Sequence, residues 1–161
     1  AEAILLATVG DGARLLPQRG TGLGDALCGA AEALLGDGYD QVALISSDNP
    51  HLPSGYVAQA FAALDAADVA LGPAEDGGYY LIALRAPHPG LFQRITWSTA
   101  AVFGETMQRA AELGLTVATL PPWYDVDDAA GLRRLRADLA TAPAGVAPHT
   151  RAVLPTILPD A

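Results

Sequence analysis

Four aspartates stand in loops beside apolar runs, where carboxylates can hold a cation. Asp48 follows the run QVALIS, Asp76 lies in LGPAEDGGYYLIAL, and Asp125 and Asp127 lie in YDVDD. Asp125 and Asp127 are two positions apart in a segment expected to be extended, so their carboxylates should point to one side. Hard divalent cations such as Mg²⁺ bind one or two carboxylates together with water and substrate phosphates. Asp48 and the pair Asp125 and Asp127 are therefore candidate metal ligands.

The segment around Asp76 has the composition of a pocket floor. Glu75 and Asp76 place two carboxylates beside Gly77 and Gly78, and glycines let the backbone approach a ligand closely. Asp-Gly is also a strong signal for a hairpin turn, and for this stretch alone the turn is the favoured interpretation.

The other acids also have structural interpretations. Asp48 could form an Asx turn that leads into Pro50, which the local sequence favours. Asp127 or Asp128 could cap the helix that follows, and capping does not exclude metal binding.

Strands and helices alternate along the chain, which predicts an α/β fold that positions these acids. Predicted strands cover residues 3–9, 41–45, 69–71, 79–84 and 116–120. Predicted helices cover residues 23–35 and 55–64, with a third after Ser98 or Thr99 and a fourth after Asp127 or Asp128. The alternation predicts a largely parallel sheet covered by helices on both faces. In such sheets ligands bind beyond the carboxyl ends of the strands, which is where the acids fall.

Composition limits the class of protein. The 161 residues suit one α/β domain, residues 1–140, followed by a Pro/Ala-rich C-terminal arm, residues 141–161. Acidic residues outnumber basic ones 18 to 9 and lysine is absent, which argues against a nucleic-acid partner. We expect neither a membrane span nor a signal peptide, because no apolar run approaches the roughly 20 residues that a membrane helix needs. The single Cys28 excludes an internal disulfide and favours a cytoplasmic location.

Four segments, taken in order, resemble a family of bacterial glycosyltransferases: SSDNPHLP, LGPAEDGGYYLIAL, ITWSTAAVFGETMQRAAELGL and YDVDDAAGL. That family belongs to the GT-A nucleotide-diphospho-sugar transferase superfamily, includes members named for arsenosugar biosynthesis, and is similar to the molybdenum-cofactor and phospholactate guanylyltransferases. The resemblance runs from about residue 15 to residue 135. It implies a three-layer Rossmann-like GT-A fold that binds a nucleotide or nucleotide sugar, with Mg²⁺ or Mn²⁺ bridging the diphosphate.

The resemblance also implies roles for individual residues. Asp48 becomes the first metal ligand and Asp127 or Asp125 the second, while Asp76 is a candidate general base for an acceptor hydroxyl. A structural role of Asp76 in the turn is an equal alternative. The residues expected at the nucleotide, the sugar or the acceptor are Gln18, Gly20, Gly24, Glu75, Gly77, Gly78, Tyr79, Trp97, Ser98 and Thr99. For each aromatic among them, core packing is the alternative.

Two departures from the family pattern leave the reaction open. Members usually begin with a strand and a loop that bears a Lys-Thr-Arg phosphate clamp, and this lysine-free chain begins past that point, so we expect an N-terminally shortened fold. It is either an incomplete piece or a protein with a damaged nucleotide site. Ala26 also stands where the family has an arginine. A shortened sheet has to expose an edge or find a partner, for which a homo-oligomer is one solution.

Two classes of function remain for this sequence. The expected one is metal-dependent glycosyl transfer from a nucleotide sugar to a small acceptor, with nucleotidyl transfer of the guanylyl type as the alternative reaction. The other class is a non-catalytic domain that binds a nucleotide or a partner protein without turnover.

Overall fold

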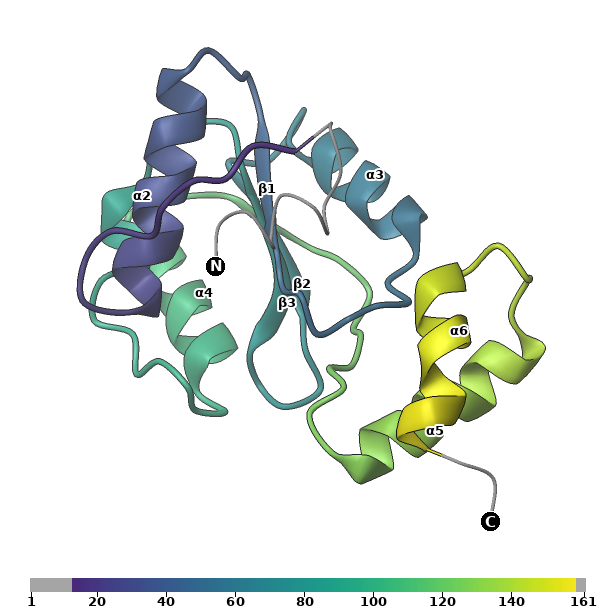
Figure 1. Cartoon of the computed structure of the whole chain (residues 1–161). Coiled ribbons are helices and arrows are strands. Elements are labelled where there is room, and N and C mark those ends of the chain that lie inside the picture. Colours follow the sequence, from purple (N-terminus) through teal and green to yellow (C-terminus); the bar gives the residue numbers. More distant parts are fainter. Residues whose placement is uncertain (1–12, 159–161) are drawn as a thin grey trace.

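Helices enclose a sheet of four strands in the computed structural model, which describes residues 13–158 (Figure 1). The elements in chain order are α2 (Leu23–Gly36), β1 (Val42–Ile45), α3 (Ser54–Ala63), β2 (Val69–Pro73), β3 (Tyr79–Leu84), the 3₁₀ helix η1 (Pro89–Phe92), α4 (Val102–Glu112), β4 (Val117–Thr119), α5 (Ala129–Thr141) and α6 (Pro148–Ile157). The strand predicted at residues 3–9 lies outside the described residues. None of the helices within residues 13–158 has the length and apolar character needed to span a bilayer.

The sheet is mixed, which corrects the prediction of a largely parallel one. Its strand order is β1-β3-β2-β4, with β3 antiparallel to both β1 and β2, and with β2 parallel to β4. The short connection at residues 74–78 explains the difference, because a parallel pair needs a crossover of about a dozen residues or more. β1, β2 and β4 nevertheless run in the same direction, so their carboxyl ends lie at one edge of the sheet.

Both faces of the sheet are covered, as the α/β prediction requires. Val69 and Leu71 of β2 are fully buried in the cluster that includes residues of α2, η1 and α4, while Ala70 between them is buried in the cluster with α3. Alternate residues of a strand point to opposite faces, so this division follows from the pleat. Figure 1 shows the same arrangement, with α2 and α4 on one side of the strands and α3 on the other. The three-layer α/β fold is confirmed.

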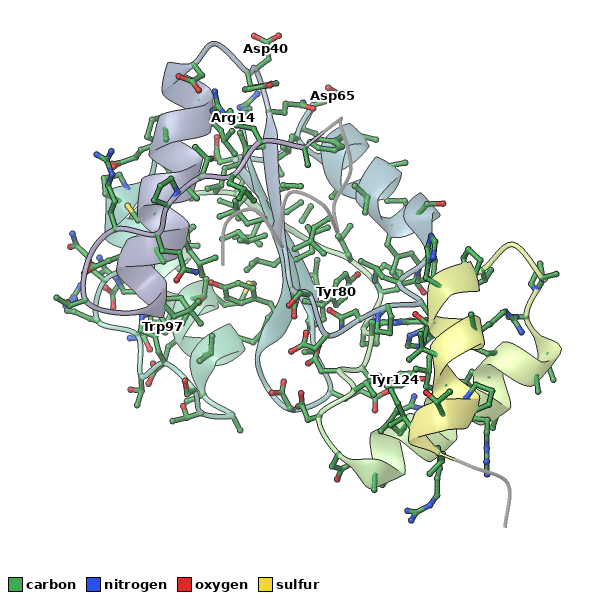
Figure 2. The ribbon with its side chains drawn as sticks, in the orientation of Figure 1. Arg14, Asp40, Asp65, Tyr80, Trp97 and Tyr124 are labelled. Atoms are coloured by element: carbon green, nitrogen blue, oxygen red, sulfur yellow. The ribbon has the colours of Figure 1, made fainter. Side chains whose placement is uncertain are left out.

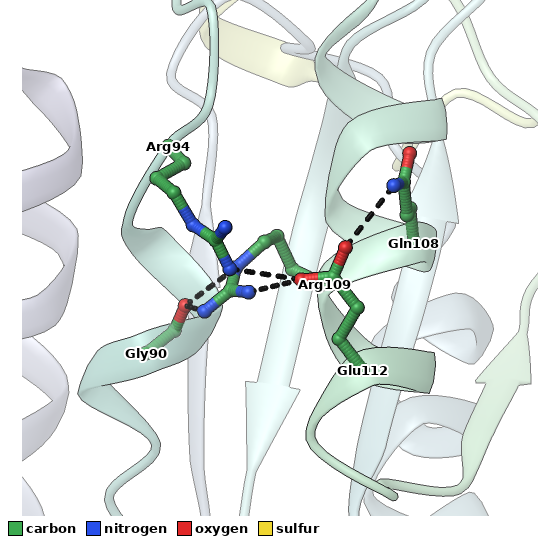
Figure 3. A network of polar contacts seen from close by, with 5 residues as sticks. All are labelled: Gly90, Arg94, Gln108, Arg109 and Glu112. Atoms are coloured by element: carbon green, nitrogen blue, oxygen red, sulfur yellow. Dashed lines mark hydrogen bonds and ion pairs between the residues drawn. The ribbon is translucent and has the colours of Figure 1, made fainter.

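A polar network joins η1 to α4 (Figure 3). Arg109 is only 9% exposed and donates from Nε and Nη2 to the carbonyl of Gly90, at 3.2 and 2.9 Å. Its Nη1 pairs with Glu112, which also accepts from Arg94 at 2.9 Å and from Gln108 at 3.1 Å. The buried guanidinium thus has partners that offset its desolvation.

The helix termini follow local chemistry only in part. Asp128 caps α5, because its carboxylate accepts the Gly131 N–H at 2.8 Å, and Asp127 does not serve as this cap. The helix predicted after Ser98 or Thr99 is α4, which begins at Val102 with Ala101 as its N-cap, so neither Ser98 nor Thr99 caps it.

The segment predicted as an arm contains helix α6, which packs against α5 through Leu154, Leu135 and Leu139. The proposed boundary between residues 140 and 141 stays a prediction.

Candidate functional site

The four aspartates line one cavity of about 740 Å³. Asp48 follows β1, Asp76 follows β2, and Asp125 and Asp127 follow β4. Because these three strands share a direction, the loops after them meet at one edge of the sheet. Figure 2 shows the labelled Tyr80 near this edge, between Trp97 on the side of α2 and α4 and Tyr124 on the side of α5. The sequence prediction that distant acids share one concavity agrees with this geometry.

Backbone and side-chain hydrogen bonds join the loop after β1 to the loop after β4. The Val126 N–H donates to the Asp48 carbonyl at 3.0 Å. Asn49 Nδ2 donates to the Tyr124 carbonyl at 3.0 Å and also to the carboxylate of Asp125. These bonds fix the backbone of Asp48 relative to that of Asp125.

Asn49 is a site residue that the sequence analysis missed. It is 6% exposed and holds the orientation of Asp125 from the position next to Asp48. The only signal in the sequence was a second polar residue directly after the strand-end aspartate, which does not indicate a partner 76 positions away.

The carboxylate of Asp48 does not make the predicted Asx turn. Such a turn needs an N–H two residues on, and that residue is Pro50, which has none. The carboxylate instead accepts a hydrogen bond from the Ser46 hydroxyl. It lines the cavity with its second oxygen uncommitted to any described hydrogen bond.

The acids interact electrostatically. Burial raises the pKa of Asp125 above its usual value, and the neighbouring charges of Asp48, Asp76 and Asp127 raise it further, against the opposing hydrogen bond from Asn49. The described residues that line the cavity include no arginine and no histidine. The cavity is therefore a site of negative potential in which a cation would relieve repulsion.

The Glu75–Gly78 segment is a hairpin turn, so its favoured interpretation is confirmed. Gly77 has φ +94°, and a Cβ on it would lie 2.3 Å from the carbonyl oxygen of Ala100. The Asp76 carboxylate accepts the Gly78 N–H at 2.8 Å and also lines the cavity. The structural and the functional interpretation of Asp76 are thus compatible.

The predicted substrate residues divide into two groups. Those that line the cavity are Gln18, Gly78, Tyr79, Trp97, Ser98 and Thr99. Those that do not line it are Gly20, Gly24, Glu75 and Gly77.

The residues of the second group have contacts or backbone conformations of their own. A Cβ on Gly24 would lie 2.5 Å from Nε1 of Trp97, so this glycine lets the start of α2 pack on the indole. Gly20 has φ +93° in the turn before α2. Glu75 forms an ion pair with Arg134. Contact of these four residues with a ligand stays a prediction.

Tyr79 and the loop after Trp97 line the same cavity as the acids. The Tyr79 ring meets Trp97 edge-on at 6.3 Å between centroids, and burial raises the pKa of its phenol. Ser98 has φ +62°, an uncommon conformation for a residue with a side chain. Glu105 of α4 holds the loop, accepting from the N–H and the hydroxyl of Thr96 at 2.5 and 3.0 Å.

The carboxylates of the cavity could supply two ligands to a hard cation, but not a complete set. Within residues 13–158 no group of three or more His, Cys, Asp or Glu side chains is arranged to hold a metal by itself. Two carboxylates completed by water and substrate phosphates remain the usual arrangement for Mg²⁺, and Asp48 with Asp125 or Asp127 offers that number.

Comparisons with known proteins agree with this fold. Residues 1–99 match the model of a family described as an uncharacterised protein conserved in bacteria, DUF2064. None of the curated proteins matches the chain significantly. A crystal structure from Desulfovibrio desulfuricans G20, provisionally described as a nucleotide-diphospho-sugar transferase, is 34% identical with a TM-score of 0.75. The match covers 86% of this chain and 64% of that protein, so the chain spans less than two thirds of its length.

Proposed function

The chain belongs to the bacterial DUF2064 family, and we propose that it is a metal-dependent transferase that uses a nucleotide sugar as glycosyl donor. The observation that carries the proposal is the convergence of four carboxylates, from the ends of three parallel-running strands, on one cavity without a basic side chain among its described lining residues. The likeness to a nucleotide-diphospho-sugar transferase supports the choice of donor.

Each side chain has a role that follows from its position. Asp48 and either Asp127 or Asp125 would hold Mg²⁺ or Mn²⁺. When bound, the ion supplies Lewis-acid stabilisation of the negative charge on the departing diphosphate. The Asp76 carboxylate, fixed by the Gly78 N–H, would accept the proton of an acceptor hydroxyl. Tyr79 and Trp97 would form an apolar wall against the sugar or the base.

The negative charge of the cavity makes a divalent ion a requirement of the proposed function. A diphosphate brought beside four carboxylates is repelled, and no described lining residue offers a positive charge. Binding of the donor should therefore need a divalent ion rather than merely improve with it.

Calorimetry with UDP-glucose and GDP-mannose, with Mn²⁺ and with EDTA, tests this requirement. We expect heat of binding for a nucleotide sugar only when Mn²⁺ is present. Binding of equal strength in EDTA would contradict the metal-dependent assignment.

The same lack of a basic residue supports a second candidate function, a domain that binds a nucleotide or a partner protein without turnover. Transfer of labelled sugar to water or to an added acceptor separates the two. Metal-dependent binding without release of nucleoside diphosphate, over many hours and with a range of acceptors, would favour the binding domain.

A further inference from the structure

Arg134 of α5 contacts two of the three loops that carry the acids of the cavity, the one with Asp76 and the one with Asp125. Its Nη1 and Nη2 donate to the two carboxylate oxygens of Glu75, at 2.6 and 2.9 Å. Its guanidinium carbon lies 3.6 Å from the centroid of the Tyr124 ring. Glu75 directly precedes Asp76, and Tyr124 directly precedes Asp125. One side chain therefore touches the neighbour of a cavity acid in each of two loops.

The backbone joins the same two loops. The Glu75 N–H donates to the Trp123 carbonyl at 3.0 Å, and the Trp123 N–H donates to the Pro73 carbonyl at 3.0 Å. Tyr124 is 5% exposed, and its hydroxyl donates to Asp138 of α5 at 2.6 Å. Tyr124 is thus held at its ring face by Arg134 and at its hydroxyl by Asp138, one helical turn further along α5.

An ordinary surface ion pair would not hold two loops in place. The side chains of Arg134 and Glu75 are 48% and 51% exposed, and exposed pairs contribute little in general. Here the guanidinium binds both carboxylate oxygens of Glu75 and also lies over the Tyr124 ring. Its position is therefore fixed by the carboxylate and by the ring together. A lysine has no planar fork and cannot reproduce this geometry.

We propose that Arg134 is a positioning residue that sets the distance between the hairpin carrying Asp76 and the loop carrying Asp125. This role rests on the proposed function for its catalytic consequence, but its structural part stands without it. Arg134 would act through Glu75 and Tyr124 and need not touch the substrate.

Hydrogen exchange followed by NMR tests the structural part without any ligand. In Arg134→Ala the amide of Glu75, bonded to Trp123, and the side-chain amide of Asn49, bonded to Asp125, should exchange faster, on the order of tenfold. Arg134→Lys keeps the charge and should exchange nearly as fast as the alanine variant. Arg133→Ala is the matched control. Arg133 is exposed and makes none of these contacts, and its replacement changes the net charge by the same amount. Exchange in Arg134→Ala as slow as in the wild-type protein would overturn the proposal.

Binding and turnover test the consequence. With Mn²⁺ as the probe, affinity should fall in Arg134→Ala and Arg134→Lys but not in Arg133→Ala, and turnover should fall more than donor affinity, by about tenfold to a hundredfold. Wild-type affinity and turnover in Arg134→Lys would show that charge alone matters and would overturn the positioning role. If the wild-type protein itself binds neither Mn²⁺ nor a nucleotide sugar, the proposed function fails, while faster exchange in Arg134→Ala would still support the structural part.

Discussion

At the scale of single residues, a substitution of Asp48 distinguishes the proposed metal binding from a role in local structure. Asp48→Asn keeps an oxygen that can accept the Ser46 hydroxyl but removes the charge that a hard cation requires. The melting temperature should change little. Mn²⁺ affinity should fall sharply, and turnover should fall on the order of 10²- to 10³-fold, the scale of removing one electrostatic stabiliser. Calorimetry and a transfer assay measure the two effects.

Asp128→Asn is the matched control for that substitution. It removes the same charge close to the same loop, but Asp128 caps α5 and asparagine caps equally well. Its Mn²⁺ affinity should stay near that of the wild-type protein. Adding Asp127→Asn to Asp48→Asn should cost little more, since ligands of one ion act as a unit. Unchanged Mn²⁺ affinity in well-folded Asp48→Asn would contradict the proposal that Asp48 is a metal ligand.

The acids of the site could be predicted from the local sequence, whereas Asn49 and Arg134 could not. The acids were predictable because each follows an apolar strand, and strand ends of one direction converge. Asn49 and Arg134 were not, because their roles depend on partners 76 and 59 positions away. A pattern of neighbouring residues carries no information on which distant loops will meet. For the same reason Glu75 was expected at the ligand, although its carboxylate is paired with Arg134.

At the scale of elements, the β2–β3 hairpin depends on one glycine. In Gly77→Ala the new Cβ would meet the Ala100 carbonyl oxygen at 2.3 Å, in a backbone with φ +94°. We expect a loss of about 1–3 kcal/mol of unfolding free energy from this strain, measured by chemical denaturation. Gly78→Ala is the control, since its Cβ would come no nearer than 3.2 Å to a carboxylate oxygen of Asp76. Equal stability of the two variants would contradict the role assigned to Gly77.

A second element contact, between the start of β2 and the start of β4, gives a pH dependence. The Asp68 carboxylate accepts from the N–H and the hydroxyl of Thr116 at 2.9 and 2.7 Å, and with Arg85 at 3.3 Å these bonds lower the pKa of Asp68 to about 2. A lowered pKa in the folded state means that the carboxylate stabilises the protein above the unfolded-state pKa of about 3.9. That contribution disappears as the pH falls from about 4 to about 2.

Thermal melts from pH 7 to pH 2 of Asp68→Asn measure this contribution. The melting temperature of the variant should lie below that of the wild-type protein at pH 7, and the difference should shrink toward pH 2. Asp65→Asn, in the exposed turn before β2, is the control and should show no such difference at any pH. A difference that grows on acidification would show that the sign is wrong.

The accuracy of the predicted elements follows the strength of their local signals. β3 was predicted with its observed bounds, because six consecutive apolar or aromatic residues begin after two glycines. The favoured hairpin turn before it implied an antiparallel β3, but the alternation of strands and helices led to the prediction of a largely parallel sheet. The short connection at residues 74–78 allows only the hairpin. α6 was missed because prolines dominate its surroundings. Pro148 is nevertheless suited to the first turn of a helix, and Pro155 is accommodated inside it.

At the scale of the whole molecule, the described residues 13–158 divide their buried apolar side chains among three clusters. Two of them lie on the two faces of the sheet, and the third joins α5 to α6 through Leu135, Leu139 and Leu154. The third cluster is small and shares no buried residue with the others. Local opening needs less free energy where few apolar contacts are lost, so α5 and α6 should open before the sheet does. Because α5 carries Arg134 and Asp138, such an opening would also release Tyr124 beside the acids.

Leu154→Ala tests this division of stability. Leu154 is 6% exposed, and its truncation should cost about 2–3 kcal/mol, the lower part of the range for a buried leucine, because α6 can shift to fill the space. Hydrogen exchange should accelerate in α5 and α6 while β2 and β3 keep their protection, and Mn²⁺ affinity should fall with the loosening of Tyr124. Val153→Ala, at an adjacent position that is 50% exposed, should leave both properties unchanged. Equal acceleration in the helices and in the sheet would mean that the molecule opens only as a unit. Opening of the site would then require the full free energy of unfolding.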